Sequence, residues 1–194
     1  AGDEARRVGL PLIVHSTTLA TAKVAVAAGA QLLVHSVEDH EVDDEFVAAM
    51  VKQGTFYCPT LTVLGGYAGL YEAKLGDAVR AQLEDVHPSV KERVLRTEDA
   101  AVRAKVNTLA MQGMRKHFAQ QSETMARNLV RLHAAGVPVV LGTDAGNPLT
   151  LHGPSIFVEL EAMQQAGLSA VDVLKASTGD AARAMGRGAD LGVI

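Results

Sequence analysis

The sequence contains little of what several classes of protein require. It has a single cysteine, Cys58, which excludes an internal disulfide and a cysteine-based zinc knuckle. Aromatic residues make up 4% of the chain, tryptophan is absent, and the 18 Lys and Arg residues are outnumbered by 22 Asp and Glu. Because nucleic-acid binding needs a basic surface with stacking rings, we expect no nucleic-acid partner.

Long hydrophobic runs are missing too. No apolar stretch approaches the roughly 18 residues of a membrane-spanning helix, and the first residues, Ala-Gly-Asp-Glu, lack the basic and apolar regions of a signal peptide. We therefore expect no membrane partner. The cellular location stays open, although a single cysteine fits the reducing cytoplasm.

The chain does have the material for one folded domain, because 48% of its 194 residues are hydrophobic. Short apolar runs lie at residues 11–15, 31–35, 55–60 and 138–143. Such continuous runs are typical of strands buried on both faces of a parallel sheet, and helical patterns lie between them. The sequence therefore predicts an α/β fold with four adjacent parallel strands.

Three of these predicted strands lead into side chains that can perform chemistry. His15 and His35 close the first and second strands, and Asp144 follows the last one. Parallel strands present their carboxyl ends at the same rim, so the three side chains should converge there.

The segment 65–134 breaks the alternation of strands and helices, because it has helical periodicity but no predicted strand. It leaves from the carboxyl end of the 55–60 strand, so we expect an inserted set of helices that covers the same rim. Upstream of it, Ser16 or Thr17 is predicted to cap a helix that ends near Ala28.

Two neutral imidazoles and a carboxylate suit a divalent metal such as Zn²⁺, which takes nitrogen and oxygen ligands. Other interpretations stay open. Either histidine can be a hydrogen-bonded core residue, and Asp144 can form an Asx turn before Asn147-Pro148. A carboxylate beside a metal can also act as a general acid–base catalyst.

Four further side chains are candidates for contact with a substrate. His152 lies in the loop after the last predicted strand and shares its rim, with a solvated loop position as the alternative. Tyr57, Tyr67 and Tyr71 lie on or just beyond the third strand, where a tyrosine can line a pocket with its ring and its polar tip. Packing in the core or in a lid is the alternative for the tyrosines.

The order of these features resembles a known family. The two strand-end histidines, the Gly-Thr-Asp-Ala-Gly turn at 142–146, the His152-Gly153 pair and the helix that contains Glu159-Leu160 resemble the amidohydrolase superfamily, in its branch of imidazolonepropionase-like and prolidase-like metal hydrolases. The resemblance implies a (β/α)8 barrel, of which this chain forms a partial domain with strands five to eight and the helical insertion.

The same resemblance implies that His15 on the fifth strand, His35 on the sixth and Asp144 on the eighth are metal ligands, with Asp144 also the catalytic acid–base. The complete enzyme would hold one or two divalent ions, with zinc as the first choice. The family's His-x-His pair is absent from the sequence, and so is its metal-bridging residue on the fourth strand. We therefore expect a fragment that needs the missing barrel half, or a homo-oligomer.

The implied function is that of a metal-dependent hydrolase. It would use a metal-activated water to cleave a C–N bond in an amide, a cyclic amide or an Xaa-Pro-type dipeptide, so its partner would be a small-molecule or dipeptide-like substrate. One alternative keeps the metal site and changes the bond to an ester or phosphoester. Another is a half-barrel that binds or assembles with a partner without catalysis.

Overall fold

The computed structural model describes residues 1–106 and 108–193. Its centre is a parallel sheet of three strands in the order β1-β2-β3, formed by β1 (Ile13–His15), β2 (Leu32–Val34) and β3 (Phe56–Cys58). All three fall within the ranges predicted from the apolar runs, and each is 3 residues long. The prediction of adjacent parallel strands is confirmed for these three.

The prediction of a fourth regular strand is wrong. The predicted segment does lie beside β3 and runs parallel to it. It forms one parallel bridge beside β3, in which Tyr57 N donates to Pro138 O and Val140 N donates to Tyr57 O, both at 2.9 Å. Pro138 has no N–H to donate. Two residues beyond Val139, the bridge residue, Leu141 N donates to Ala176 O at 3.0 Å, so the chain leaves the sheet.

Local signals set the ends of the first helices. Helix α1 (Gly2–Val8) ends at Gly9, whose φ of 69° is the left-handed conformation that glycine tolerates. Helix α2 (Leu19–Ala27) is capped by Thr18, whose hydroxyl accepts from Thr21 N at 3.3 Å. The prediction of Ser16 or Thr17 as this cap was therefore wrong by one residue or two.

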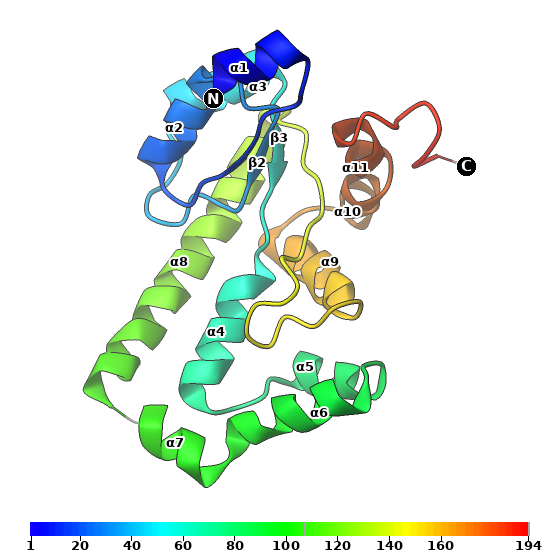
Figure 1. The fold of residues 1–194 in the computed structure, drawn as a ribbon. Helices are drawn as coiled ribbons and strands as arrows, with labels where there is room; N and C mark the ends of the chain where they lie inside the picture. Colours follow the sequence, from blue (N-terminus) through cyan, green and yellow to red (C-terminus); the bar gives the residue numbers. More distant parts are fainter. Residues whose placement is uncertain (107, 194) are drawn as a thin grey trace.

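The remaining helices follow the predicted pattern. Helix α3 (Asp44–Gln53) begins after the cap residue Asp43 and ends at Gly54. The segment between β3 and the fourth run is helical, and its helices α4 and α8 lie side by side and extend away from the sheet (Figure 1). The elements after α3, in chain order, are β3, α4 (Thr62–Glu72), α5 (Asp77–Ala81), η1 (Gln82–Glu84), α6 (Pro88–Leu95), η2 (Arg96–Glu98), α7 (Ala100–Val106), α8 (Leu109–Ala134), α9 (Ser155–Ala166), α10 (Ala170–Ser177) and α11 (Gly179–Ala184).

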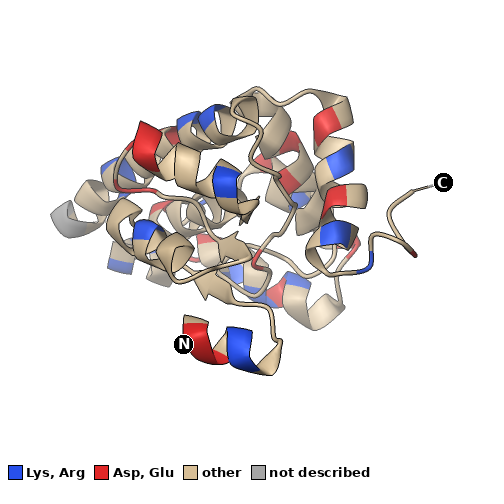
Figure 2. Ribbon diagram, turned by 90° about the horizontal axis from the view of Figure 1, so that it is seen from above, with Lys and Arg blue, Asp and Glu red and all other residues tan. Residues whose placement is uncertain are grey.

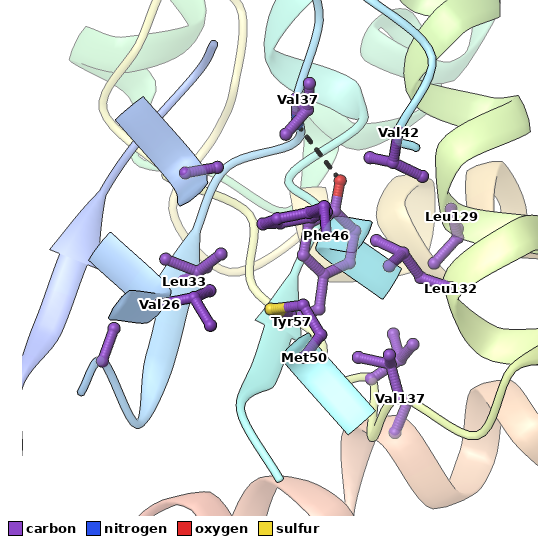
Figure 3. Packing of buried hydrophobic residues seen from close by; sticks show 14 of the residues in the cluster. Val26, Leu33, Val37, Val42, Phe46, Met50, Tyr57, Leu129, Leu132 and Val137 are labelled. Atoms are coloured by element: carbon purple, nitrogen blue, oxygen red, sulfur yellow. Dashed lines mark hydrogen bonds between the residues drawn. The ribbon is translucent and has the colours of Figure 1, made fainter. Parts of the chain in front are cut away.

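The core lies between one face of the sheet and helices α2, α3 and α8 (Figure 3). Leu33 and Tyr57 project into it from the strands, and Phe46 and Met50 meet them from α3. Each such side chain contributes roughly 1.5–3 kcal/mol by leaving water. On the opposite face of the sheet Ile13 is 56% exposed, so the two faces are covered unequally.

Charged residues of both signs are mixed along the helices, as the view in Figure 2 shows. Many of these residues form ion pairs, within one helix or between neighbouring helices, as Lys23 does with Asp43. Among the helices of the described residues, none is long and apolar enough to cross a membrane.

Candidate active site

The carboxyl ends of the strands bring the predicted histidines together. His15 is the last residue of β1 and His35 directly follows β2. Because the two strands run parallel and in register, the two rings lie with their centroids 4.4 Å apart and their planes at 72°. Asp144 reaches the same place from the fourth run, with Oδ2 at 4.0 Å from His35 Nε2.

Three strand ends at this rim share an unusual backbone conformation. His35, Thr60 and Asp144 have φ values of 76°, 47° and 50°, in the left-handed region. A residue other than glycine held there costs about 1–3 kcal/mol, and such residues cluster at sites where side chains must be aimed. Here the turns direct the side chains of all three residues into one cavity.

The His35 ring is fixed by a neighbour and kept neutral by its surroundings. Its Nδ1 lies 2.8 Å from Thr60 Oγ1. Burial, and to a smaller extent His15, lower the pKa of His35, while Asp144 acts in the opposite direction. In the tautomer that protonates Nδ1, this nitrogen donates to Thr60 and Nε2 keeps a free lone pair, which is how a metal-binding histidine is commonly held.

Asp144 is held by the side chain of Asn147, and among the described residues no backbone N–H donates to the Asp144 carboxylate, as the Asx turn considered from the sequence would require. Asn147 Nδ2 donates to Asp144 Oδ2 at 2.7 Å and to its carbonyl oxygen at 3.1 Å. Tyr67 Oη donates to Asn147 Oδ1 at 2.9 Å, so helix α4 is connected to the carboxylate. The side chain of Asp144 remains 41% exposed and open to the cavity. Asn147 was missed as a functional residue, because its side-chain bonds to Asp144 and Tyr67 form only in the folded chain.

The cavity at this rim has a volume of about 220 Å³. The strand ends and the turns after them supply most of its polar side, and α4 and α8 supply much of its apolar side through Val63, Leu64 and Met125. The segment inserted after β3 therefore closes the space above the histidines. The complete lining is His15, Thr17, His35, Ser36, Glu38, Thr60, Val63, Leu64, Tyr67, Met125, Asp144 and Asn147.

Glu38 is a second carboxyl group in this lining that the sequence did not single out for a role. Burial raises its pKa, and the strongest opposing influence comes from His117 on α8. A partly buried carboxyl group with a raised pKa can hold a proton nearer to neutral pH than an exposed one.

Of the four side chains predicted to contact a substrate, only Tyr67 lines the cavity. Tyr57 points to the core instead and is fully buried, with its oxygen accepting from Val37 N at 3.3 Å (Figure 3). Burial raises the pKa of Tyr57 to about 12. Alternation along β3 explains the error, because neighbouring residues of a strand face opposite sides.

The other two predicted contacts also lie elsewhere. Tyr71 stacks on Phe118 of α8, with centroids 5.6 Å apart and ring planes at 22°. His152 is exposed and lines a different cavity, on the far side of the loop that follows Asp144. Cys58 is buried, which raises the pKa of its thiol to about 12 and leaves it unreactive as a nucleophile.

The donor atoms at the rim are of the types that bind a divalent metal, but among the described residues there are too few of them to complete a site. His15 and His35 offer imidazole nitrogens, which zinc prefers, and Asp144 offers a nearby carboxylate oxygen. Across residues 1–106 and 108–193, no group of three or more His, Cys, Asp or Glu is arranged to hold an ion. The two histidines by themselves are fewer than the ligands of a protein zinc site.

Glu159 lies outside the cavity and fixes the backbone next to it. It is fully buried on α9 and accepts hydrogen bonds from Leu61 N at 2.8 Å and from Thr62 N at 2.9 Å, at the start of α4. Burial raises its pKa to about 7. Because Thr60, the partner of His35, immediately precedes these two residues, Glu159 fixes the turn that places Thr60.

Comparison with known proteins gives a consistent assignment. A family model described as "Amidohydrolase family" matches residues 1–194. A search of curated proteins found no match. Similar solved structures include a Xaa-Pro dipeptidase with bound methionine in the active site (TM-score 0.64, 19% identity, 97% of this chain and 37% of that one). They also include molinate hydrolase (TM-score 0.60, 21% identity, 98% of this chain and 36% of that one). A third is a bottromycin amidohydrolase (TM-score 0.63, 25% identity, 96% of this chain and 43% of that one). The chain thus spans about two fifths of the length of these proteins.

Proposed function

This chain belongs to the amidohydrolase family, and from that premise we propose that it carries part of the active site of a metal-dependent hydrolase that cleaves a C–N bond. The observation that carries the proposal is the meeting of His15, His35 and Asp144 in one cavity at the carboxyl ends of parallel strands. Active sites of (β/α)8 barrels are built at that end of the strands.

His15 and His35 are the residues that would hold a divalent metal, with zinc favoured by their nitrogen ligands. A divalent ion bound there would supply a Lewis acid that lets water react at neutral pH. The hydrogen bond from the His35 ring to Thr60 orients this ligand, and the lowered pKa of His35 keeps its ring neutral and able to bind.

Asp144 is proposed to move the proton of the reaction. Its carboxylate opens into the cavity that the histidines line, so it can accept a proton from the attacking water. It can then deliver that proton to the leaving nitrogen, which departs as a neutral amine. The hydrogen bond from Asn147 to Oδ2 holds the carboxylate in place during both transfers.

The part of the site that this chain forms is small. Its volume of about 220 Å³ is below the roughly 300–1,000 Å³ of drug-sized pockets, and the rest of the barrel would complete it. We propose an amide, a cyclic amide or an Xaa-Pro-type dipeptide. The bound methionine in the active site of the similar Xaa-Pro dipeptidase supports a ligand of this size.

We further propose that residues 1–194 correspond to strands five to eight of the barrel. The chain covers 36–43% of three similar structures, and Ile13 on the open face of the sheet is 56% exposed. The rest of the barrel would supply the remaining metal ligands and cover this face. A homo-oligomer is the other arrangement that could do so.

Metal analysis of histidine variants tests the proposal. In the full-length protein, His15→Ala and His35→Ala should each lower the bound divalent metal by at least about tenfold at a fixed chelator concentration, because each removes a direct ligand. His133→Ala is the matched control, since His133 lies on α8 with Asp172 at 3.9 Å and does not line the cavity. Full metal content in both strand-end variants would overturn the proposal.

A further inference from the structure

A second cavity lies on the other side of the loop that carries Asp144. Its volume is about 580 Å³, within the roughly 300–1,000 Å³ of small-molecule pockets. The walls come from α4, from α6 with the turn η2, and from residues 146–152. Asn147 lines both this cavity and the candidate active site, so a single loop separates them.

The loop wall of this second cavity is held in shape by its own backbone. Gly146 N donates to Thr150 O and Thr150 N donates to Asn147 O, both at 3.0 Å. Leu149 takes a left-handed conformation, with φ at 57°, between these bonds. The cavity wall is therefore formed before any ligand arrives.

The floor of the second cavity is apolar. Leu70 contributes from α4, Val94 from α6, and Leu149 and Leu151 from the loop. Val94 and Leu151 are nearly buried members of a small separate core that packs the insertion against this loop. An aliphatic or aromatic group can replace water on such a floor with a gain in free energy.

Two arginines lie at the rim of the second cavity. Arg93 and Arg96 line it from α6 and η2, and His152 lines it from the loop, while no Asp or Glu is found among its described lining residues. Arg96 pairs with Glu92 at 2.7 Å, but both side chains are about two thirds exposed, and such surface pairs exchange easily. Within the part of the chain that the structure describes, no carboxylate lies within ion-pair distance of Arg93.

The groove between α2 and α3 differs from the second cavity, because its lysine is ion-paired. Lys23 lines that groove and is already paired with Asp43 at 2.7 Å and with Glu45 at 2.5 Å, and Glu45 itself is part of the lining. Its cation is satisfied by the protein. The second cavity instead combines an apolar floor with Arg93, which has no carboxylate partner among the described residues, and with Arg96, whose partner Glu92 lies outside the lining.

We propose that the second cavity is a binding site for a small organic anion, with an apolar body on the floor and a carboxylate at Arg93 and Arg96. The planar guanidinium group of arginine donates paired hydrogen bonds that match a carboxylate. The site uses none of the metal-binding side chains, so it stands whether or not the hydrolase assignment holds.

Calorimetric titration of the full-length protein with octanoate tests this site. Octanoate should bind saturably at one site, and octylamine, which has a similar chain and the opposite charge, should not bind there. Arg93→Ala should weaken octanoate binding roughly tenfold or more, because it removes a charge-assisted hydrogen bond. Lys91→Ala removes one positive charge from the same helix outside the cavity and should change the affinity less than about twofold, as expected of a screened surface charge.

Two outcomes would overturn the site. One is the absence of saturable octanoate binding to the unmutated protein. The other is equal weakening by Arg93→Ala and Lys91→Ala, which would indicate general charge attraction. Because Arg93 is exposed, its variant should fold, and Val90→Trp gives a second check. Val90 is 39% exposed and lines the cavity, so the larger ring should block octanoate without disturbing the core.

Discussion

His35 illustrates how a single residue is prepared for chemistry. A left-handed backbone turns its ring into the cavity, burial keeps the ring neutral, and Thr60 binds one nitrogen so that the other faces Asp144. The sequence predicted His35 and its place at a strand end. It gave no indication of Thr60, because that contact joins residues 25 positions apart through the pairing of β2 with β3.

Thr60 should therefore control the affinity of the site for metal. Thr60→Val keeps the shape of the buried side chain but removes the hydroxyl that orients His35, and loss of such a partner typically weakens metal binding about 10–100-fold. Thr60→Ser keeps a hydroxyl and should retain most of the affinity. Competition with a chelator measures both variants, and equal affinity in Val and Ser variants would show that the hydroxyl has no orienting role.

Other residues could not be assigned correctly without the structure. Tyr57, Tyr67 and Tyr71 had equal standing as pocket residues in the sequence, yet only Tyr67 lines the cavity. The side of the sheet on which Tyr57 lies depends on strand register. The direction of the Tyr71 side chain depends on how α4 packs against α8. Asn147 escaped notice because its role depends on hydrogen bonds to Asp144 and Tyr67.

The start of helix α4 depends on a buried carboxyl group of another helix. Glu159 of α9 receives the N–H groups of Leu61 and Thr62, which have no partner inside α4 because they lie at its start. This arrangement satisfies the helix end, but it places a carboxyl group with a pKa of about 7 in the interior.

The raised pKa of Glu159 predicts a pH-dependent stability. Its pKa rises from an ordinary value of 4.5 to about 7 on folding, so the folded state binds the proton more tightly than the unfolded chain. The stabilisation from this group is full below pH 4.5 and is lost as the pH rises through 7. The loss amounts to about 3 kcal/mol by linkage.

Glu159→Gln removes this titration and provides the comparison. The free energy of unfolding of the unmutated protein, minus that of the variant, should fall by about 3 kcal/mol between pH 4.5 and 8. Denaturant unfolding of both proteins across this range measures the difference. Parallel stability curves would show that Glu159 does not titrate on folding.

The regular elements were the most predictable features. Gly9 and Gly54 end α1 and α3, because each takes the left-handed conformation that glycine favours, and such a stop is a local signal in the sequence. The fourth strand was predicted too long, because apolar character does not reveal that Leu141 bonds to Ala176 instead of β3. Local signals predict local conformation, whereas pairing depends on partners far along the chain.

For the whole molecule, the parallel sheet and its helices place the candidate chemistry at one rim, with α4 and α8 standing over it (Figure 1). The direction of the strands made this rim predictable. The shapes of the two cavities were not, because both are formed by the packing of the inserted helices against loops from elsewhere in the chain.

We propose that the cavity at this rim performs hydrolysis with Asp144 as its acid–base group. The most direct test is Asp144→Asn in the full-length protein, with equal metal content confirmed, assayed on the best substrate from a panel of Xaa-Pro dipeptides and cyclic amides. Asparagine keeps the size of the side chain but cannot carry the proton, so turnover should fall roughly 10²–10⁴-fold. Hydrolysis by the metal-loaded variant at the unmutated rate would show that Asp144 does not transfer the proton.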